Sequence, residues 1–309
     1  MLEKEEEFTS GFVAIVGAPN SGKSTLLNKL LRRKIAMVAP KPQSTRHRIA
    51  GILTERNFQI IFWDTPGYHA SERVLNKEMI ARTLSAVRDS DVCLWLVDGI
   101  RRGASHELTG ELVRSLLGEK KVLIAVNKAD AVPRAEILEL KNSLEEEFPE
   151  AVVAEVSAKT GYRLRSLKKS LAGLLEPGEA LYPDDALTDQ PVRVIASELV
   201  REAVFRLTEK EIPYSTAVTV DEYREAGDPA RKDSAKTYIA ATIHVEKENQ
   251  KRIVIGKGGS KLVSIGKLAR EHIERFLGEE VFLELFVRLT RDWSKNLKSV
   301  RDFGYGDKL

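Results

Sequence analysis

Short apolar runs alternate with longer amphipathic stretches over the first part of the chain. The apolar runs have the length of buried strands, and the stretches between them repeat apolar residues at the spacing of helices with one buried face. This alternation predicts a mostly parallel, six-stranded sheet flanked by helices. We expect strands at residues 12–17, 47–55, 58–65, 92–98, 121–127 and 151–157, and helices near residues 23–33, 73–88, 104–118, 133–147 and 161–175.

The pattern changes after residue 176. Residues 176–190 (EPGEALYPDDALTDQ) hold two prolines, a glycine and several acids with little periodicity, which is typical of a linker. The order that follows is helix 192–208, strand 216–225, strand 236–246, helix 248–255, a glycine turn, helix 259–276 and strand 281–289. We therefore expect an α/β domain at residues 1–176, a linker at 177–190 and an α+β domain at 191–309.

Composition limits the classes of protein. The chain has 309 residues, of which 42% are hydrophobic and 31% charged, and this is ordinary for a soluble protein of one or two domains. No apolar run approaches the length of a membrane span, and the acidic N-terminus (MLEKEEEF) does not resemble a signal peptide, so we expect a cytoplasmic protein. Cys93 is the only cysteine, which excludes an internal disulfide and a thiolate metal cluster. We expect it to be a small core residue.

The net charge of +3 is unevenly distributed. Residues 191–309 carry 22 Lys and Arg against 19 Asp and Glu, whereas residues 1–190 are balanced. Residues 251–275 concentrate seven basic side chains against two acidic ones. A basic face of this kind favours a polyanion partner, although a solvated charged surface would explain the charge equally well without further signals.

The string GAPNSGKS at residues 17–24 lies between an expected strand and an expected helix. In that context G-x-x-x-x-G-K-S predicts a phosphate-binding loop whose backbone N–H groups face the phosphates. Lys23 is expected to reach the β- and γ-phosphates, and the Ser24 hydroxyl to bind Mg²⁺. The residues expected to touch the nucleotide here are Gly17, Ala18, Pro19, Asn20, Ser21, Gly22, Lys23, Ser24 and Thr25.

DTPG at residues 64–67 also stands at a strand end. Asp64 can hold the Mg²⁺ shell, and the Gly67 N–H can meet the γ-phosphate, with Thr65 and Pro66 between them at the nucleotide. A proline-glycine turn after a strand is common, so the string gains its meaning from following the phosphate loop.

NKAD at residues 127–130 indicates which base is bound. The Asp130 carboxylate can accept two hydrogen bonds from guanine, which adenine cannot return. Asn127 is expected to tie this segment to the phosphate loop, and the stem of Lys128 to cover the purine. In SAK, the Ala158 N–H is offered to the guanine oxygen, flanked by Ser157 and Lys159. Three strings in this order predict GTP binding.

These strings resemble the GTPases of the translation-factor-like class, and together with the module after the linker they resemble the Era family of bacterial ribosome-assembly GTPases over nearly the whole chain. The resemblance implies a first switch at residues 41–48 (KPQSTRHR) with Thr45 as a second Mg²⁺ ligand; the residues alone do not separate Ser44 from Thr45. It also implies that Lys23, Thr45, Gly67 and Asn20 act in hydrolysis of GTP.

Tyr68 stands after DTPG, where Ras-like GTPases have a glutamine that orients the attacking water. We therefore expect slow intrinsic hydrolysis. GTPases that look similar often use K⁺ at the phosphates, and Asn20 matches the asparagine that goes with it; equal rates in sodium and potassium would contradict this hypothesis.

IGKGG at residues 255–259 resembles the G-x-x-G loop of a KH domain, here in the type II order. Such a turn lets phosphates approach helix N–H groups, and lysines add positive charge. The residues expected to bind RNA are Ile255, Gly256, Lys257, Gly258, Gly259 and Lys261. The resemblance implies single-stranded 16S ribosomal RNA near its 3′ end and the 30S subunit as partners of a monomer. Trp293 is expected to pack, while Phe303 and Tyr305 could stack on bases or close the domain.

Three functions are compatible with these signals. The first is a switch in which GTP orders two segments and thereby controls RNA binding in 30S assembly. The second is a regulatory GTPase whose basic domain makes peripheral contact with the anionic inner membrane. The third, a passive RNA scaffold with a vestigial nucleotide site, is disfavoured because Lys23, Ser24, Asp64 and Asp130 are all present.

Overall fold

The computed structural model describes residues 7–38, 49–68, 74–101, 104–228 and 235–305. It forms two compact units, of which the first takes most of the residues up to Asp189 and the second takes all those from Gln190 onward. Among the described residues, no helix is both long enough and apolar enough to cross a membrane.

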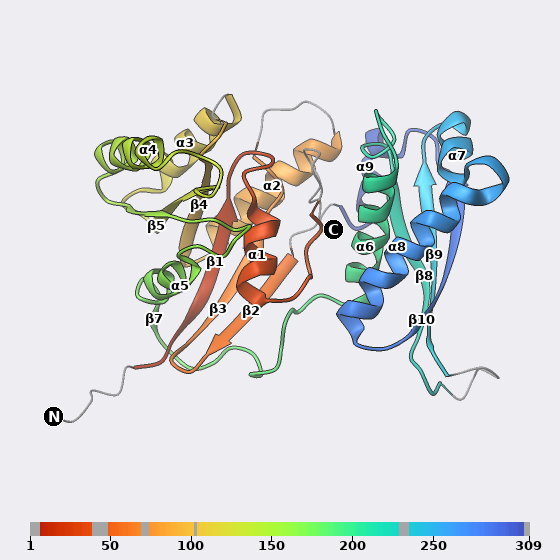
Figure 1. The fold of residues 1–309 in the computed structure, drawn as a ribbon, viewed down its shortest axis with the longest axis horizontal. Helices are drawn as coiled ribbons and strands as arrows, with labels where there is room; N and C mark the ends of the chain where they lie inside the picture. The colour runs from red at the N-terminus through yellow and green to blue at the C-terminus, as the bar shows by residue number, and fades with distance from the viewer. Residues whose placement is uncertain (1–6, 39–48, 69–73, 102–103, 229–234, 306–309) are drawn as a thin grey trace. The chain divides into compact units, whose positions relative to one another are not determined.

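The first unit is a parallel sheet with helices on its faces (Figure 1). Its strands are β1 (Thr9–Val16), β2 (Ile49–Glu55), β3 (Phe58–Asp64), β4 (Val92–Asp98), β5 (Lys121–Asn127), β6 (Val152–Glu155) and the short β7 (Glu176–Pro177). Its helices are α1 (Lys23–Leu31), α2 (Val74–Asp89), α3 (Ala104–Leu116), α4 (Arg134–Glu147) and α5 (Leu164–Ala172).

The strand order is β2-β3-β1-β4-β5-β6, and β7 pairs with β1. Of the strands that the structure describes in this sheet, β2 and β7 alone run antiparallel to their neighbours. The expected six-stranded, mostly parallel sheet is therefore confirmed, with β7 added. The carboxyl ends of the parallel strands form one edge, where an open α/β sheet places its ligands.

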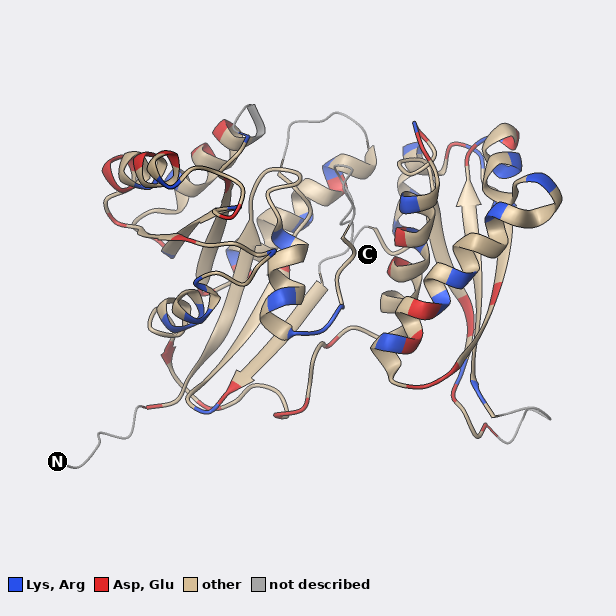
Figure 2. Cartoon of the chain, viewed as in Figure 1, with Lys and Arg blue, Asp and Glu red and all other residues tan. Residues whose placement is uncertain are grey.

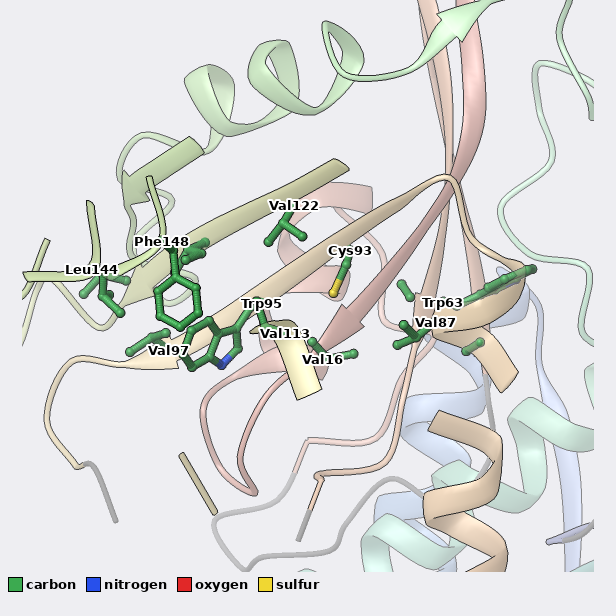
Figure 3. Packing of buried hydrophobic residues seen from close by; sticks show 14 of the residues in the cluster. Val16, Trp63, Val87, Cys93, Trp95, Val97, Val113, Val122, Leu144 and Phe148 are labelled. Carbon is green, nitrogen blue, oxygen red and sulfur yellow. The ribbon is translucent and has the colours of Figure 1, made fainter. Parts of the chain in front are cut away.

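Apolar strands fill the interior of this unit. Trp95 on β4 packs edge-on against Phe148, with ring centroids 5.4 Å apart and an interplanar angle of 78° (Figure 3). Cys93 lies in the same cluster, as expected, and burial raises the pKa of its thiol to about 12. A thiol that stays protonated at neutral pH is a packing group rather than a nucleophile.

Residues 178–189 are hydrogen-bonded to the sheet of the first unit. The Gln59 side chain accepts hydrogen bonds from the N–H groups of Leu181 and Tyr182 and donates to the Tyr182 carbonyl. Ile52 donates its N–H to the Leu187 carbonyl at 2.9 Å. The stretch that its composition marked as a linker is thus held along β2 and β3.

The second unit has the order α6 (Val192–Leu207), β8 (Ala217–Arg224), β9 (Thr237–Val245), α7 (Glu248–Ile255), α8 (Ser260–Leu277) and β10 (Val281–Leu289). The sheet order is β10-β9-β8, in which β9 and β10 are parallel and β8 and β9 antiparallel. This is the expected α+β arrangement. It continues into the 3₁₀ turn η2 (Trp293–Lys295) and α9 (Leu297–Asp302), neither of which was predicted.

Aromatic side chains close the end of this unit. Trp293 and Tyr305 are fully buried with ring centroids 5.8 Å apart, and the Trp293 indole N–H donates to the Ser215 carbonyl at 2.9 Å. Phe303 packs against Trp293 and against His244. The expectation that Trp293 packs is confirmed, and Tyr305 and Phe303 take the same role.

Candidate nucleotide-binding site and glycine turn

The turn between β1 and α1 forms a loop of backbone N–H groups at the carboxyl edge of the sheet. Gly22, which precedes the helix, has a φ of +105°, and a Cβ there would lie 2.3 Å from Asn127 Nδ2. Both the conformation and the space exclude a larger residue. The free N–H groups at the start of α1 and the dipole of that helix favour an anion in front of the loop.

Lys23 begins α1 and is buried. Its Nζ donates to the carbonyls of Gly17 and Ala18, both at 3.0 Å, so the side chain folds back over the loop. Burial lowers the pKa of Lys23 to about 8, and the nearby Asp64 carboxylate opposes this shift. A lysine held in this way provides a positive charge at the position of the phosphates.

Ser24 and Asp64 meet behind the loop. The Ser24 hydroxyl donates to Asp64 Oδ2 at 2.6 Å, and both side chains are buried. A hydroxyl and a carboxylate are the hard oxygen donors that Mg²⁺ prefers, and Mg²⁺ normally takes only one or two protein ligands together with phosphate and water. The residues present therefore fit the ion that the motif implies.

The DTPG segment lies against the phosphate loop. The Thr65 hydroxyl is buried and donates to the Ile15 carbonyl at 2.7 Å, which anchors the end of β3 to β1. The Tyr68 N–H donates to the Gly17 carbonyl at 3.1 Å. A Cβ on Gly67 would lie 2.8 Å from Pro19 Cα. The side chain of Thr65 thus stabilises the strand end, and only its backbone is left to face a nucleotide.

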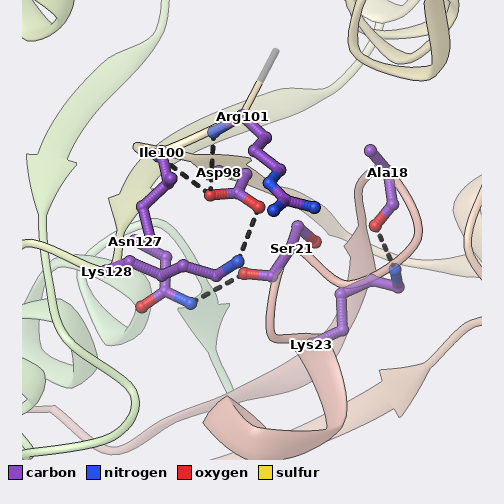
Figure 4. A network of polar contacts seen from close by, with 8 residues as sticks. All are labelled: Ala18, Ser21, Lys23, Asp98, Ile100, Arg101, Asn127 and Lys128. Atoms are coloured by element: carbon purple, nitrogen blue, oxygen red, sulfur yellow. Dashed lines mark hydrogen bonds and ion pairs between the residues drawn. The ribbon is translucent and has the colours of Figure 1, made fainter. Parts of the chain in front are cut away.

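Asn127 joins three loops, and Figure 4 shows its hydrogen bond to Ser21 in the phosphate loop. Its Nδ2 donates to the Ser21 carbonyl at 2.7 Å, and its Oδ1 accepts the Ala158 N–H at 2.9 Å. The expected link to the phosphate loop is present. The Ala158 N–H, which is expected to meet the guanine oxygen, donates to Asn127 in this structure.

Asp98 is a site residue that sequence reasoning missed. Its Oδ2 accepts a hydrogen bond from Lys128 Nζ at 2.6 Å, and its Oδ1 accepts the Ile100 N–H at 2.9 Å (Figure 4). Asp98 pairs with Asn127 in the β4–β5 register, so both end their strands at the same edge. A carboxylate ending a buried apolar run was the signal that could have identified it.

Asp130 accepts a hydrogen bond from the Ser157 hydroxyl at 2.6 Å, and that hydroxyl also accepts the Thr160 N–H. Ser157 is fully buried, so this contact fixes the Asp130 carboxylate beside the loop that carries Ala158. The remaining expected residues of the loops lie beside these: Asn20 is exposed in a left-handed conformation, Lys159 is exposed, and Thr25 is half-buried in the first turn of α1. Thr45 and the first switch lie outside the described residues.

The glycine turn of the second unit separates α7 from α8. Gly256 ends α7, its N–H donating to the Arg252 carbonyl at 2.8 Å, and a Cβ on it would lie 2.6 Å from Lys261 Cβ. Lys257–Gly259 form the short turn η1, in which Gly258 has a φ of +59°. Lys257 and Gly258 are exposed, and Lys261 and Ile255 are half-buried. All six residues expected to bind RNA therefore lie at one corner.

Comparison with known proteins extends these observations. A family model described as a 50S ribosome-binding GTPase matches residues 12–128, and a KH-domain model matches residues 211–294. GTPase Era of Geobacter sp. (strain M21) is 44% identical over 303 residues, which cover 97% of this chain and 99% of that protein.

Two solved structures match 97% of this chain and 100% of their own, each with a TM-score of 0.91. One is an Aquifex aeolicus Era variant bound to GDP.AlF4-, at 37% identity. The other is Era in complex with MgGDPNP and nucleotides 1506–1542 of 16S ribosomal RNA, at 38% identity. With two matching domains and this identity along the entire length, the chain belongs to the Era family of GTPases.

Proposed function

We propose that this chain is a GTP-hydrolysing switch that binds single-stranded 16S ribosomal RNA near its 3′ end and acts in assembly of the 30S subunit. The observation that carries the proposal is Asn127, which joins the phosphate loop to the base-reading loops through two hydrogen bonds in a chain that also holds a KH domain. Support for the RNA partner comes from the relative solved with MgGDPNP and 16S RNA. Division into a GTPase domain at 1–176 and an RNA-binding domain at 191–309 is part of the proposal.

The phosphate loop and Lys23 would hold the phosphates, and Ser24 and Asp64, with Thr45, would hold Mg²⁺. The ion supplies positive charge at the phosphates when it is bound. Asp130 reads the guanine edge, Lys128 covers the base from its position against Asp98, and Asn127 fixes the distance between the two halves of the site.

Base recognition is tested with Asp130→Asn. An amide donates where the carboxylate accepted, so preference should move from guanosine toward xanthosine nucleotides. Lys23→Ala should abolish nucleotide binding, and Lys141→Ala on α4 is the matched control. Binding is measured with fluorescent GDP and XDP. An unchanged preference in Asp130→Asn would mean that the base lies elsewhere.

RNA binding is tested with the double variant Lys257→Ala and Lys261→Ala, for which Lys236→Ala is the control on the β8–β9 hairpin side of the same domain. The double variant should bind RNA of the 16S 3′ end more weakly than wild type, and its loss of affinity should exceed that of the control. If the nucleotide state controls RNA binding, the affinity of the wild type for RNA must differ between the GTP-analogue and GDP states. A ligand shifts an equilibrium only by its differential affinity for the two states. Equal affinities would leave two independent binding modules.

Hydrolysis is proposed to be slow, because Tyr68 replaces a water-orienting glutamine, and to be stimulated by K⁺ at Asn20. Single-turnover rates in potassium and in sodium, for wild type and Asn20→Ala, test this. Stimulation should be present in wild type and lost in the variant, and equal rates in both salts remove the potassium role.

The proposed location is the cytoplasm and the proposed state is a monomer. Peripheral contact with the inner membrane is a second location, and its support is the basic composition of residues 251–275. Flotation with anionic vesicles at physiological salt decides between them, and sedimentation velocity measures the oligomeric state.

A further inference from the structure

A basic groove lies between α1 and α5 in the first unit. None of the described residues that line it belongs to a GTP motif, and Gly161 is the one that adjoins such a motif, through its hydrogen bond to Ser157. The groove has a volume of about 450 Å³ and is lined by Lys29, Arg32, Arg165 and Lys168, and Glu55 is the one carboxylate among the described residues of the lining. Four cations against one acid make an unusual wall on a domain whose overall sequence charge is balanced.

A second hollow of about 430 Å³ continues the first one. The two share Glu55 and Arg165, and the second adds Arg56 and Lys169, with Glu7 as its further acid. Figure 2 shows the blue side of α5 and the blue turn that follows α1. We call the two hollows together the α1–α5 groove.

Most of this charge is not neutralised within the protein. Lys168 forms an ion pair with Glu55. The other five cations are exposed and, within the part of the chain that the structure describes, form no ion pair: Lys29, Arg32, Arg56, Arg165 and Lys169. Like charges gathered without partners repel one another and raise the local potential, which an anionic ligand relieves.

The groove is also built on regular structure. Leu164, Leu167 and Leu171 bury one side of α5, which leaves Arg165 and Lys169 on the exposed side. A Cβ on Gly161 would lie 3.2 Å from Lys29 Cε, so the absence of a side chain at this loop makes room for the lysine. Cations on helices and beside a compact loop keep their spacing better than cations on a free tail.

From these observations we infer that the α1–α5 groove binds the sugar–phosphate backbone of RNA and gives the GTPase domain its own RNA contact. The inference extends the proposed function but uses none of the glycine-turn residues. Arginine and lysine suit phosphate oxygens, and an open polar groove suits a chain of phosphates. A lipid surface is the weaker occupant, since Leu30 and Leu164 in the lining are buried and offer no apolar group for insertion.

The test uses the full chain with three charges removed from the groove: Lys29→Gln, Arg32→Gln and Arg165→Gln. The matched control removes three exposed cations from other surfaces of the same unit: Arg88→Gln, Arg114→Gln and Lys121→Gln. Two RNAs are titrated at several salt concentrations. One is the RNA of nucleotides 1506–1542, and the other carries an added duplex in front of that RNA.

The groove variant should lower the salt slope of binding to the longer RNA by about 2, since each phosphate contact contributes roughly 0.7 to 0.9, and should weaken binding about tenfold near 0.1 M salt. Control variant and wild type should agree, and GDP affinity and melting temperature should be unchanged or raised in the groove variant. A groove variant that binds the longer RNA like the control overturns the inference. So does a groove variant that keeps its RNA binding and loses only its binding to anionic vesicles in a flotation assay.

Failure of the glycine-turn proposal is distinguishable from failure of this one. If Lys257→Ala with Lys261→Ala binds both RNAs like wild type while the groove variant loses the longer RNA, the inference stands and the glycine turn is misassigned. If wild type binds neither RNA, both are wrong.

Discussion

Removing the Asn127 side chain tests whether one amide holds the nucleotide site together. In Asn127→Ala, the Ser21 carbonyl and the Ala158 N–H lose their partners at 2.7 and 2.9 Å. Asn127 is 2% exposed, so water cannot replace it without rearrangement. Stranding a buried polar group costs about 1–3 kcal/mol, so two such groups should lower the free energy of unfolding by about 3 kcal/mol.

The assay is urea unfolding of the nucleotide-free protein, with Asn142→Ala on an exposed turn of α4 as the control. GDP affinity, measured separately, should fall as well, because the phosphate loop and the base-reading loop no longer share a fixed spacing. A loss of unfolding free energy below about 0.5 kcal/mol, the range of ordinary surface substitutions, would refute the claim that this amide stabilises the site.

A second variant, Gly22→Ala, tests the contact between position 22 and the Asn127 side chain. The Cβ of Gly22→Ala would lie 2.3 Å from Asn127 Nδ2, and the backbone there has a φ of +105°. Backbone strain of about 1–3 kcal/mol remains in any background, whereas the clash disappears when Asn127 is alanine. The double variant should therefore be less destabilised than the sum of the single variants, by about 1 kcal/mol or more. Strict additivity would show that the two side chains do not meet.

Three further predictions concern single groups. Burial lowers the pKa of Lys23 from 10.5 to about 8, so the unfolded chain binds more protons than the folded chain between these two pH values. The stability of the nucleotide-free protein should therefore rise as pH increases from about 8 to 10.5. Lys23→Met should flatten that rise in chemical denaturation. Burial, with Arg288 nearby, lowers the pKa of His244 from 6.5 to about 4. The contribution of neutral His244 to the free energy of unfolding should therefore be lost as pH falls from 6.5 through 4. His244→Gln should remove this pH dependence in thermal melts. Trp293→Phe removes the donor to the Ser215 carbonyl and should cost about 1–3 kcal/mol in urea unfolding, whereas Trp293→Ala should cost more because it also removes the ring. A loss below about 0.5 kcal/mol in Trp293→Phe would mean that the hydrogen bond contributes nothing beyond packing.

Elements with strong periodicity could be predicted from the sequence because burial of their apolar residues dominates their stability. The apolar run VCLWLVD is β4 with all its residues buried, and the alternation in the second half matches the order of the KH domain. Ends of elements were less well predicted. The helix expected from residue 161 begins at Leu164, because Gly161 and Arg163 are left-handed. β7 and α9 are too short to have a periodic signal.

The nucleotide motifs identified the loops and the link from Asn127 to the phosphate loop, but not the other contacts among the loops. The Lys128–Asp98 pair, like the Ala158–Asn127 bond, depends on register between β4 and β5 and on the path of the loop after β6. Neither is encoded in local spacing. The α1–α5 groove could not be predicted from the sequence for a related reason. Acidic residues elsewhere in residues 1–190 bring the net charge of this part to zero, and only the fold brings Lys29 and Arg165 together.

The stretch at residues 178–189 has a consequence for how molecules meet one another. β2 is one of the two outer strands in the order β2-β3-β1-β4-β5-β6, and outer strands offer open N–H and C=O groups to any other chain. Here the Ile52 N–H is taken by the Leu187 carbonyl and the Ala50 carbonyl by the Thr188 hydroxyl. A segment that composition marks as mere connection thus occupies the place where a neighbouring copy could add a strand, and it protects the folded protein against edge-to-edge aggregation.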